Sequence, residues 1–486
     1  MVTKSWYKHP AAIVAAGVLF VAAFVGALMV TDVIPDLFVG TSNNEEHYSE
    51  LERHRAEQRA TSDAAAPATE NAAASPESAT PGAPGADAAA ASGKPAAKSF
   101  RTYWTDYRGP NRDGRYEEAK VLTSWPSGGL QAVWRQPVGG GYASFVVAEG
   151  VAFTIEQRRQ KEAVAAYDIQ TGRELWTNEW DADFRESMGG DGPRATPTWH
   201  EGRIYALGAT GELRCLDAKT GKPAWSRNIL KDNGAQNLEW GMSGSPLVVD
   251  DKVIVLPGGT SGKSVAAYNR MTGQPVWQAL NDKQGYVSPM LAQLAGKRHV
   301  VVVTSSRVVG LEVADGSLVW EYAWNTSMGI NCSQPIVVSD NRLFISSGYG
   351  KGAAVVELTR SGDGLSARTV WENTAMKNKF NSSVLHEGHI YGLDEGILTC
   401  VDVETGARKW KGGRYGYGQL LLASGHLIVL SDTGELALVK ATPDQHAEVA
   451  KFSALEGKTW NYPALAGGRL LVRNATHMAC YNVSGE

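Results

Sequence analysis

Short runs of alternating apolar and polar residues, separated by turn residues, fill most of the chain after residue 130. One of them, AYDIQTGRELW (residues 166–176), places an Asp, a Thr-Gly pair and a Trp at fixed spacing. Such alternation predicts strands. Asp and Gly predict a tight turn, because Asp bonds backbone two residues on and Gly tolerates a positive φ. The run therefore predicts two strands joined by a hairpin, with the Trp on the outer strand.

The same pattern recurs down the chain, in full or decayed form. Its final aromatic residue falls at positions about 45 residues apart, namely Trp134, Trp176, Trp225, Trp277, Trp320, Trp371, Trp410 and Phe452. Another hairpin precedes each Asp, so we predict four antiparallel strands in each repeat unit. Strand repeats of this length are typical of propellers. We interpret the seven Trp residues as structural docking groups, each packing a large ring against the next sheet.

The two ends of the repeat region complete each other. The first unit has only its outer strand, around Trp134, whereas the last unit, GGRLLVRNATHMACYNV, has inner strands and no Trp-bearing partner. Pairing the Trp134 segment with the segment around Cys480 would close the ring and remove its free edges. The sequence thus predicts an all-β fold, a closed eight-bladed β-propeller, over residues 100–486.

An uncharged stretch precedes the repeats. Residues 11–30 form an apolar run of 20 residues, which as a helix would cross a hydrocarbon core of about 30 Å. A cleaved signal peptide is the alternative, but its apolar region is usually shorter. We expect a cytoplasmic N-terminus over residues 1–10 and one transmembrane signal-anchor helix over residues 11–31. Lysines before it and acidic residues after it place the rest of the chain on the periplasmic side of the cell inner membrane.

Residues 32–99 lack the pattern of a packed domain. Residues 43–58, NNEEHYSELERHRAEQ, could form a short charged helix. The Ala/Pro/Ser/Gly-rich stretch that follows has nothing large and apolar to bury, so it predicts a disordered tether. About 40 flexible residues would give a root-mean-square reach of roughly 35 Å.

Composition and short motifs narrow the classes of function that the sequence supports. The formal net charge is -4 with 20% charged residues, so nothing favours nucleic-acid binding. The four cysteines form no C-x-x-C or haem-attachment pattern. The pair in HEGH (386–389) occupies the same hairpin turn as HEGR (200–203), which indicates solvated turn residues. GGTSGKS (258–264) lacks the first glycine of a phosphate-binding loop. We predict no metal site and no catalytic residue.

In a propeller, the segments just before the innermost strands form one mouth of the central channel. Here they are GGGYAS, GGDGPRATP, WGMSGSP, QGYVSP, GINCSQP, NKFNSS, YGYGQ and TWNYP. Small residues let these backbones converge, which is a purely structural explanation. Their larger side chains predict instead a ligand-binding funnel formed by Tyr142, Asp191, Arg194, Trp240, Tyr286, Asn331, Asn381, Tyr417 and Trp460. Cys332 could be a reactive thiol or a small buried hydrophobe.

The Ala-x-Asp-x-x-Thr-Gly-x-x-x-Trp spacing resembles the tryptophan-docking repeat of the pyrroloquinoline-quinone (PQQ) propeller superfamily. That superfamily includes quinoprotein alcohol dehydrogenases and the outer-membrane assembly lipoprotein BamB. The lead-in YRGPNRDG (107–114) is similar to that of anchored or secreted bacterial members. The resemblance implies the propeller fold from about residue 100 onward. It also implies that an active quinoprotein would carry adjacent bridged cysteines, an acidic calcium site and a catalytic Asp.

This chain departs from the quinoprotein pattern. No two cysteines are adjacent, and Asp191 is the sole carboxylate of the mouth segments. We therefore expect a membrane-anchored, extracytoplasmic propeller that acts as a non-catalytic binding or scaffold module without a cofactor. Its partners would be envelope or membrane proteins, or a small polar ligand. The alternative is a PQQ-dependent quinoprotein oxidoreductase, similar to alcohol dehydrogenases, using PQQ with calcium.

Overall fold

The computed structural model describes residues 44–65, 103–362 and 364–485. The predicted anchor and most of the predicted tether lie outside these residues. Among the helices described, none combines the length and apolarity needed to cross a membrane. The chain divides into two compact units, residues 1–47 and residues 48–486. The second unit contains every strand.

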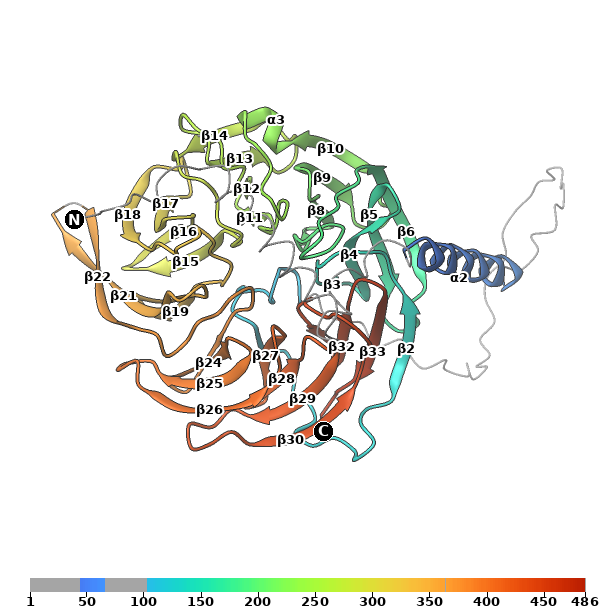
Figure 1. Ribbon diagram of the computed structural model, residues 1–486. Helices are drawn as coiled ribbons and strands as arrows, with labels where there is room; N and C mark the ends of the chain where they lie inside the picture. Colours follow the sequence, from blue (N-terminus) through green and yellow to red (C-terminus); the bar gives the residue numbers. More distant parts are fainter. Residues whose placement is uncertain (1–43, 66–102, 363, 486) are drawn as a thin grey trace, which may run out of the picture. The chain divides into compact units, whose positions relative to one another are not determined.

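Eight sheets are arranged radially around one axis (Figure 1). Each of the first four uses four consecutive strands: β3 (Val146–Ala148), β4 (Val151–Arg158), β5 (Lys161–Asp168) and β6 (Glu174–Asp181); β7 (Thr198–His200), β8 (Arg203–Leu207), β9 (Glu212–Asp217) and β10 (Pro223–Asn228); β11 (Leu247–Val249), β12 (Lys252–Val255), β13 (Val265–Asn269) and β14 (Pro275–Ala279); β15 (Met290–Leu294), β16 (Lys297–Val303), β17 (Arg307–Glu312) and β18 (Leu318–Ala323). A short helix, α3 (Ile229–Asn233), follows β10.

The next three sheets repeat this order: β19 (Ile336–Ser339), β20 (Arg342–Ser347), β21 (Gly352–Ser361) and β22 (Gly364–Asn373); β23 (Val384–His386), β24 (His389–Asp394), β25 (Ile397–Asp402) and β26 (Arg408–Arg414); β27 (Gln419–Ala423), β28 (His426–Leu430), β29 (Glu435–Lys440) and β30 (Glu448–Ser453). The short strand β1 (Arg115–Tyr116) pairs in parallel with β27. The last sheet has the order β2 (Ala132–Pro137), β33 (His477–Asn482), β32 (Arg469–Arg473) and β31 (Ala464–Ala466). The predicted eight-bladed propeller is confirmed.

The last sheet closes the ring as predicted. β2 pairs antiparallel with β33, and Trp134 lies opposite Cys480 in the register. The first outer strand of the chain therefore completes the final blade. Closure leaves no sheet without its fourth strand, so no blade presents an unpaired inner hairpin to solvent.

The Asp-x-x-Thr-Gly turn and the Trp of the preceding blade interlock. Asp168 accepts hydrogen bonds from the backbone N and the hydroxyl of Thr171, both at 2.8 Å, and Gly172 adopts a φ of 70°. A Cβ on Gly172 would lie 2.6 Å from the ring of Trp134. That ring donates from Nε1 to the carbonyl oxygen of Ile169 at 3.0 Å. The motif thus needs glycine for two reasons: the backbone has a positive φ at this position, and the Trp ring of the preceding blade leaves no room for a Cβ.

Five further Trp residues donate in the same way to the next blade, from Trp176, Trp225, Trp277, Trp371 and Trp410 to the carbonyls of Ala218, Arg270, Val313, Val403 and Thr442. Trp320 differs, because the blade that follows it carries a decayed turn. Its buried Nε1 has no hydrogen-bond partner among the described residues. Phe452 packs edge-on against Trp125 and Tyr481 instead.

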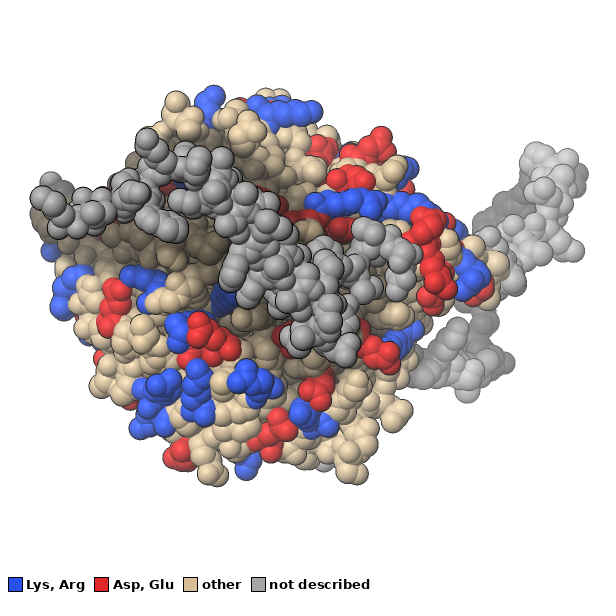
Figure 2. Space-filling model, in the orientation of Figure 1, with Lys and Arg blue, Asp and Glu red and all other residues tan. Residues whose placement is uncertain are grey.

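The core lies between neighbouring sheets. Tyr205 and Cys215 of one blade, for example, pack with Val253 and Tyr268 of the next in one buried cluster. On the surface, basic and acidic side chains are interspersed over the visible lower part of the molecule (Figure 2). This mixture is consistent with the nearly balanced formal charge.

The charged stretch before the tether forms α2 (Asn44–Ala65), which continues beyond the predicted helix into the first residues of the predicted tether. Tyr48, Leu51 and Arg55 are buried, with exposed fractions of 6%, 1% and 2%. The helix therefore has a packed face that its largely polar sequence did not predict.

Candidate functional site: an aromatic funnel with a sealed floor

A cavity of about 590 Å³ lies where the segments before the innermost strands converge. Six of the nine predicted funnel residues line it, namely Tyr142, Arg194, Trp240, Tyr286, Tyr417 and Trp460. The other lining residues are Tyr107, Met188, Gly189, Ser243, Ser288, Met328, Ile330, Cys332, Tyr349, Lys379, Phe380, Gln419 and Tyr462. The mouth segments thus build one shared cavity from all parts of the ring.

Three predicted funnel residues do not line the cavity. Asn331 is 1% exposed, donates to the carbonyl of Thr304 at 2.8 Å and accepts from the hydroxyl of Ser347 at 2.6 Å. Asn381 is equally buried and accepts from Asn378 at 3.2 Å. Short amide side chains find such local partners readily. Both residues therefore hold their loops together and contribute nothing to the lining.

Asp191 is the third residue outside the lining. Its neighbour Gly192 packs closely against the backbone of Gly140. The carboxylate lies near Tyr48 of α2, where burial and then Asp191 raise the pKa of the tyrosine to about 12. Arg194 lies within ion-pair distance of Glu186, at 4.0 Å, and stacks on Phe184, 4.6 Å from the ring centre.

One wall of the cavity is a continuous row of rings. Phe380 lies 4.9 Å from Tyr417 and 4.7 Å from Trp460, measured between ring centres. Trp460 continues to Tyr142 at 5.5 Å. Aromatic pairs at these separations attract one another beyond simple area burial. The wall is therefore a rigid apolar surface suited to stacking against a planar or apolar group.

The opposite wall combines a second ring pair with flexible side chains. Trp240 lies 5.5 Å from Tyr286, and burial raises the pKa of Tyr286 to about 12, which keeps its hydroxyl protonated. Met188 and Met328 are 70% and 63% exposed, the largest values for big apolar side chains among the described residues. Exposed methionines adapt to varied partners because the thioether chain is flexible and polarizable.

Three basic residues surround the mouth, and all of them lie over aromatic rings. Lys379 is 4.8 Å from the ring centre of Tyr417 and 3.5 Å from its hydroxyl. Lys458 lies 4.3 Å from the ring centre of Trp460, and burial lowers the pKa of both Lys458 and Arg194. The lining itself contains no Asp or Glu. Arg194 lies 4.0 Å from a carboxylate oxygen of Glu186, and Lys458 donates to the carbonyl oxygen of Gly189 at 2.6 Å. Lys379 is therefore the cation of the mouth that an anionic group in the cavity would meet, since a cation stacked on rings keeps much of its charge available.

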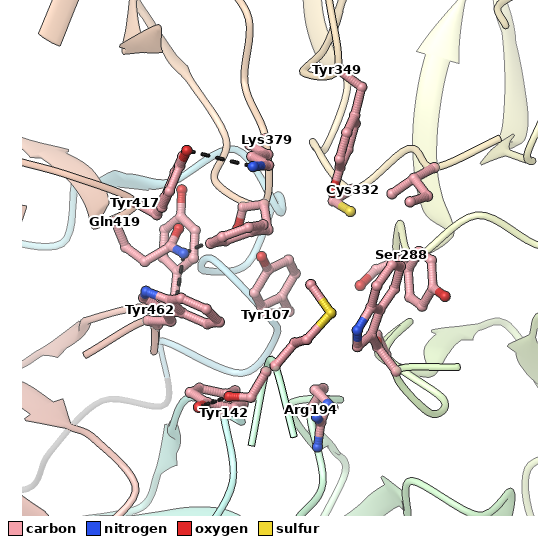
Figure 3. A pocket seen from close by; sticks show the side chains of 18 of the residues that line it. Tyr107, Tyr142, Arg194, Ser288, Cys332, Tyr349, Lys379, Tyr417, Gln419 and Tyr462 are labelled. Atoms are coloured by element: carbon pink, nitrogen blue, oxygen red, sulfur yellow. Dashed lines mark hydrogen bonds between the residues drawn. The ribbon is translucent and has the colours of Figure 1, made fainter. Parts of the chain in front are cut away.

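The lead-in YRGPNRDG forms the floor of the cavity. Tyr107 is part of the lining and packs edge-on against Tyr462 at 5.4 Å. Figure 3 shows Tyr107 at the centre of the view, with Lys379 above it and Tyr142 and Arg194 below. The lead-in therefore closes the channel at this level and makes the cavity blind.

Arg112 fixes the lead-in to three blades. Its guanidinium donates to the carbonyl oxygens of Pro246 and Pro289 at 2.5 and 2.7 Å and to the hydroxyl of Thr198 at 3.3 Å. It also pairs with Asp106 at 3.0 Å. The residue is 2% exposed. A buried charge with this many acceptors is fully solvated by the protein, so the seal is stable.

Arg108 holds the other side of the floor. It donates to the carbonyl of Ser383 at 2.6 Å and lies 5.0 Å from the ring centre of Tyr462. Arg108 and Arg112 both have positive φ values, 65° and 57°. A positive φ costs free energy in residues other than glycine, so the contacts of the two side chains must stabilise this backbone conformation.

Cys332 lines the cavity without the features of a reactive thiol. Burial raises its pKa to about 12. A nucleophilic cysteine needs a lowered pKa, because the thiolate is the reactive form. This geometry favours the small-hydrophobe interpretation.

Sequence reasoning missed several lining residues. Lys379 and Phe380 precede Asn381 in the segment NKFNSS, so the sequence indicated the segment but not which of its side chains line the cavity. Tyr349 comes from the turn between β20 and β21, outside all the mouth segments. Tyr107 lies in a motif that was used only for the resemblance. Nothing local in that motif shows that it crosses the channel.

Residues 160–412, just over half of the chain, match the family model described as outer membrane protein assembly factor BamB. The chain belongs to this family. BamB of Bordetella pertussis is 22% identical over 370 residues, which cover 68% of this chain and 92% of that protein. The structure of this chain is similar to the crystal structure of BamB from Moraxella catarrhalis, with a TM-score of 0.52 and 17% sequence identity. The similarity covers 74% of this chain and 98% of that one.

A second group of relatives consists of dehydrogenases. The 1-butanol dehydrogenase (cytochrome c) of Thauera butanivorans is 27% identical over 169 residues, covering 34% of this chain. The match spans only 23% of the dehydrogenase. The match to the BamB family model shows the family of this chain. The match to the dehydrogenase covers less than a quarter of that enzyme's length.

The lining does not fit a calcium-bound quinone. Calcium takes about six to eight oxygen ligands, with carboxylates prominent among them, and the lining supplies no carboxylate. The part of the chain that the structure describes contains no group of three or more His, Cys, Asp or Glu placed to hold a metal. All four cysteines are free. The donor set therefore differs from the one that the quinoprotein resemblance implies.

Proposed function

We propose that this protein is a non-catalytic binding module of the cell envelope whose partner inserts an anionic, partly apolar group into the funnel. The observation that carries the proposal is the combination of rigid aromatic walls with the ring-stacked Lys379 and no lining carboxylate. The BamB relatives, named as outer membrane assembly factors, support a protein partner in the envelope. The predicted anchor would place the propeller on the periplasmic side of the inner membrane.

The rim offers a direct test. A photo-crosslinking amino acid at Met328, in the full-length chain in its native membrane, is expected to capture an envelope protein. The same group at Leu318, which is 47% exposed on the outer strand β18, is the matched control and is expected to capture nothing. Equal capture from both positions, or capture that survives Lys379→Met unchanged, would contradict the funnel as the binding site.

One observation favours the alternative, a PQQ-dependent oxidoreductase. Stacked rings and cations around a cavity of about 590 Å³ would also suit a flat anionic cofactor. Titration of the full chain with PQQ, with and without calcium, distinguishes the two functions. We expect no saturable cofactor absorbance and no dye-linked alcohol oxidation. Calcium-dependent binding with turnover would replace the binding-module proposal.

A further inference from the structure

The helix α2 buries one narrow face although its sequence is polar throughout. Its buried residues are Tyr48, Leu51 and Arg55, spaced three and four apart, and the partly buried Gln58 follows at three. This spacing places all four on one side of a helix. Tyr48 and Leu51 are the only large apolar residues in NEEHYSELERHRAEQRATSDAA. An isolated helix of this composition is marginal in water, so the contacts of this face sustain it.

Arg55 makes the central contacts of that face. Its guanidinium donates to Gln136 Oε1 at 2.9 Å and to the carbonyl of Pro137 at 2.8 Å. Its Nε lies 3.2 Å from a carboxylate oxygen of Glu174, and the group stacks over Tyr167 at 5.0 Å. A planar group with five donors satisfies all these partners at once, which a lysine would not do.

These partners come from two different blades. Gln136 and Pro137 lie on β2, which closes the last blade, whereas Tyr167 and Glu174 lie on β5 and β6 of the first. Gln58 repeats the bridge, because it donates to Gln136 at 2.9 Å and accepts from the backbone N of Glu174 at 3.3 Å. The helix therefore spans the seam at which the ring closes.

Further ion pairs extend the contact. Glu174 also pairs with Arg158 at 2.5 Å, and Arg158 pairs with the buried Glu156 at 2.5 Å. Near the start of the helix, Glu52 pairs with Arg159. Removing the Arg55 charge would leave Glu174 with one cation fewer in a poorly hydrated site, which is costly.

We propose that residues 48–58 are an intramolecular clasp that binds the seam between the first and last blades. On this proposal the chain is held to the propeller both before residue 66 and after residue 102, so the predicted tether does not set the distance of the propeller from the membrane. Tyr48 lies beside Gly140 and Asp191, which belong to two of the mouth segments. If residues 11–31 span the membrane, residues 32–43 are the link between that span and α2, which can reach at most roughly 40 Å.

The test uses the full-length chain with a protease site inserted between residues 70 and 95 and a tag at the N-terminus. After cutting, the wild-type propeller is expected to remain with the tagged fragment. Arg55→Glu is expected to release it at least tenfold faster. Arg53→Glu, on the exposed face of the same helix, is the matched control and is expected to behave as wild type. A wild-type propeller that leaves as fast as the Arg55→Glu propeller would overturn the proposal.

Two further measurements cover misfolding and exchange between copies. The pair Glu52→Cys with Arg159→Cys is expected to be joined within one chain by a short bis-maleimide crosslinker, because the two long side chains meet across the contact, whereas Arg53→Cys with Arg159→Cys is expected to react much more slowly. This readout does not depend on Arg55. When two differently tagged chains are mixed before cutting, the propeller should stay with its own tag. Recovery with the other tag would assign the seam to a second copy and overturn the intramolecular clasp.

Discussion

Buried or half-buried basic residues lie at both the floor and the mouth of the funnel, but the groups that contact them differ between the two places. At the floor, Arg112 is surrounded by carbonyl oxygens and paired with Asp106. At the mouth, Lys379 lies over aromatic rings, and among the described residues its ammonium donates to a tyrosine hydroxyl, at 3.5 Å. The floor cation is thus committed to the fold. The mouth cation keeps its capacity to meet a ligand.

The largest effect should follow from removing the floor cation. Arg112→Met deletes the donors that this residue gives to the seal and leaves the partly buried Asp106 without its cationic partner. Burial already raises the pKa of that carboxyl, and Arg112 counteracts the rise. We expect the free energy of unfolding to fall by about 3–5 kcal/mol in denaturant titrations. As the control, Arg298→Met removes the exposed ion pair with Asp250 and should cost less than about 1 kcal/mol. Similar losses for both variants would show that Arg112 does not hold the floor.

A smaller effect, and one of a different kind, is expected at the mouth. Lys379→Met preserves the stem that packs against Gly348 but removes the charge. The free energy of unfolding should change by less than about 1 kcal/mol, because no buried acid loses a partner. Capture of the partner from the Met328 position should fall about tenfold, as expected for a lost charge-assisted contact of about 1.4 kcal/mol. Strong destabilisation without loss of capture would make Lys379 a structural residue like Arg112.

The contrast also separates what the sequence could predict from what it could not. The Trp and Gly positions were predictable because each turn is local and its fit to the neighbouring Trp repeats from blade to blade. Ring closure was predictable because the two incomplete units, at Trp134 and Cys480, complement each other. Both inferences depend on pattern and not on any single contact.

The floor and the clasp carried no comparable signal. Arg112 binds carbonyls of Pro246 and Pro289, more than a hundred residues away, and backbone acceptors leave no trace in a side-chain pattern. Arg55 likewise meets Glu174 across a long stretch of chain. At the mouth, register identified the right segments, but it did not decide between Phe380 and Asn381. That choice depends on local hydrogen bonds that turn the amide away from the cavity.

The last test begins with the native chain and measures how well water solvates a charge inside the mouth. Burial raises the pKa of Cys332 to about 12, and Lys379 opposes this rise, so at pH 8 the thiolate fraction should be about 10⁻⁴. Alkylation of native Cys332 by iodoacetamide, followed by mass spectrometry, should therefore be at least about a hundredfold slower than for a free cysteine. The rate should rise with pH up to pH 10 without levelling near 8.5. Lys379→Met should slow it further, because the opposing charge is gone. A plateau near pH 8.5 would mean that the mouth is as wet as bulk solvent, and the distinction between a dry, cation-bearing mouth and ordinary surface would fail.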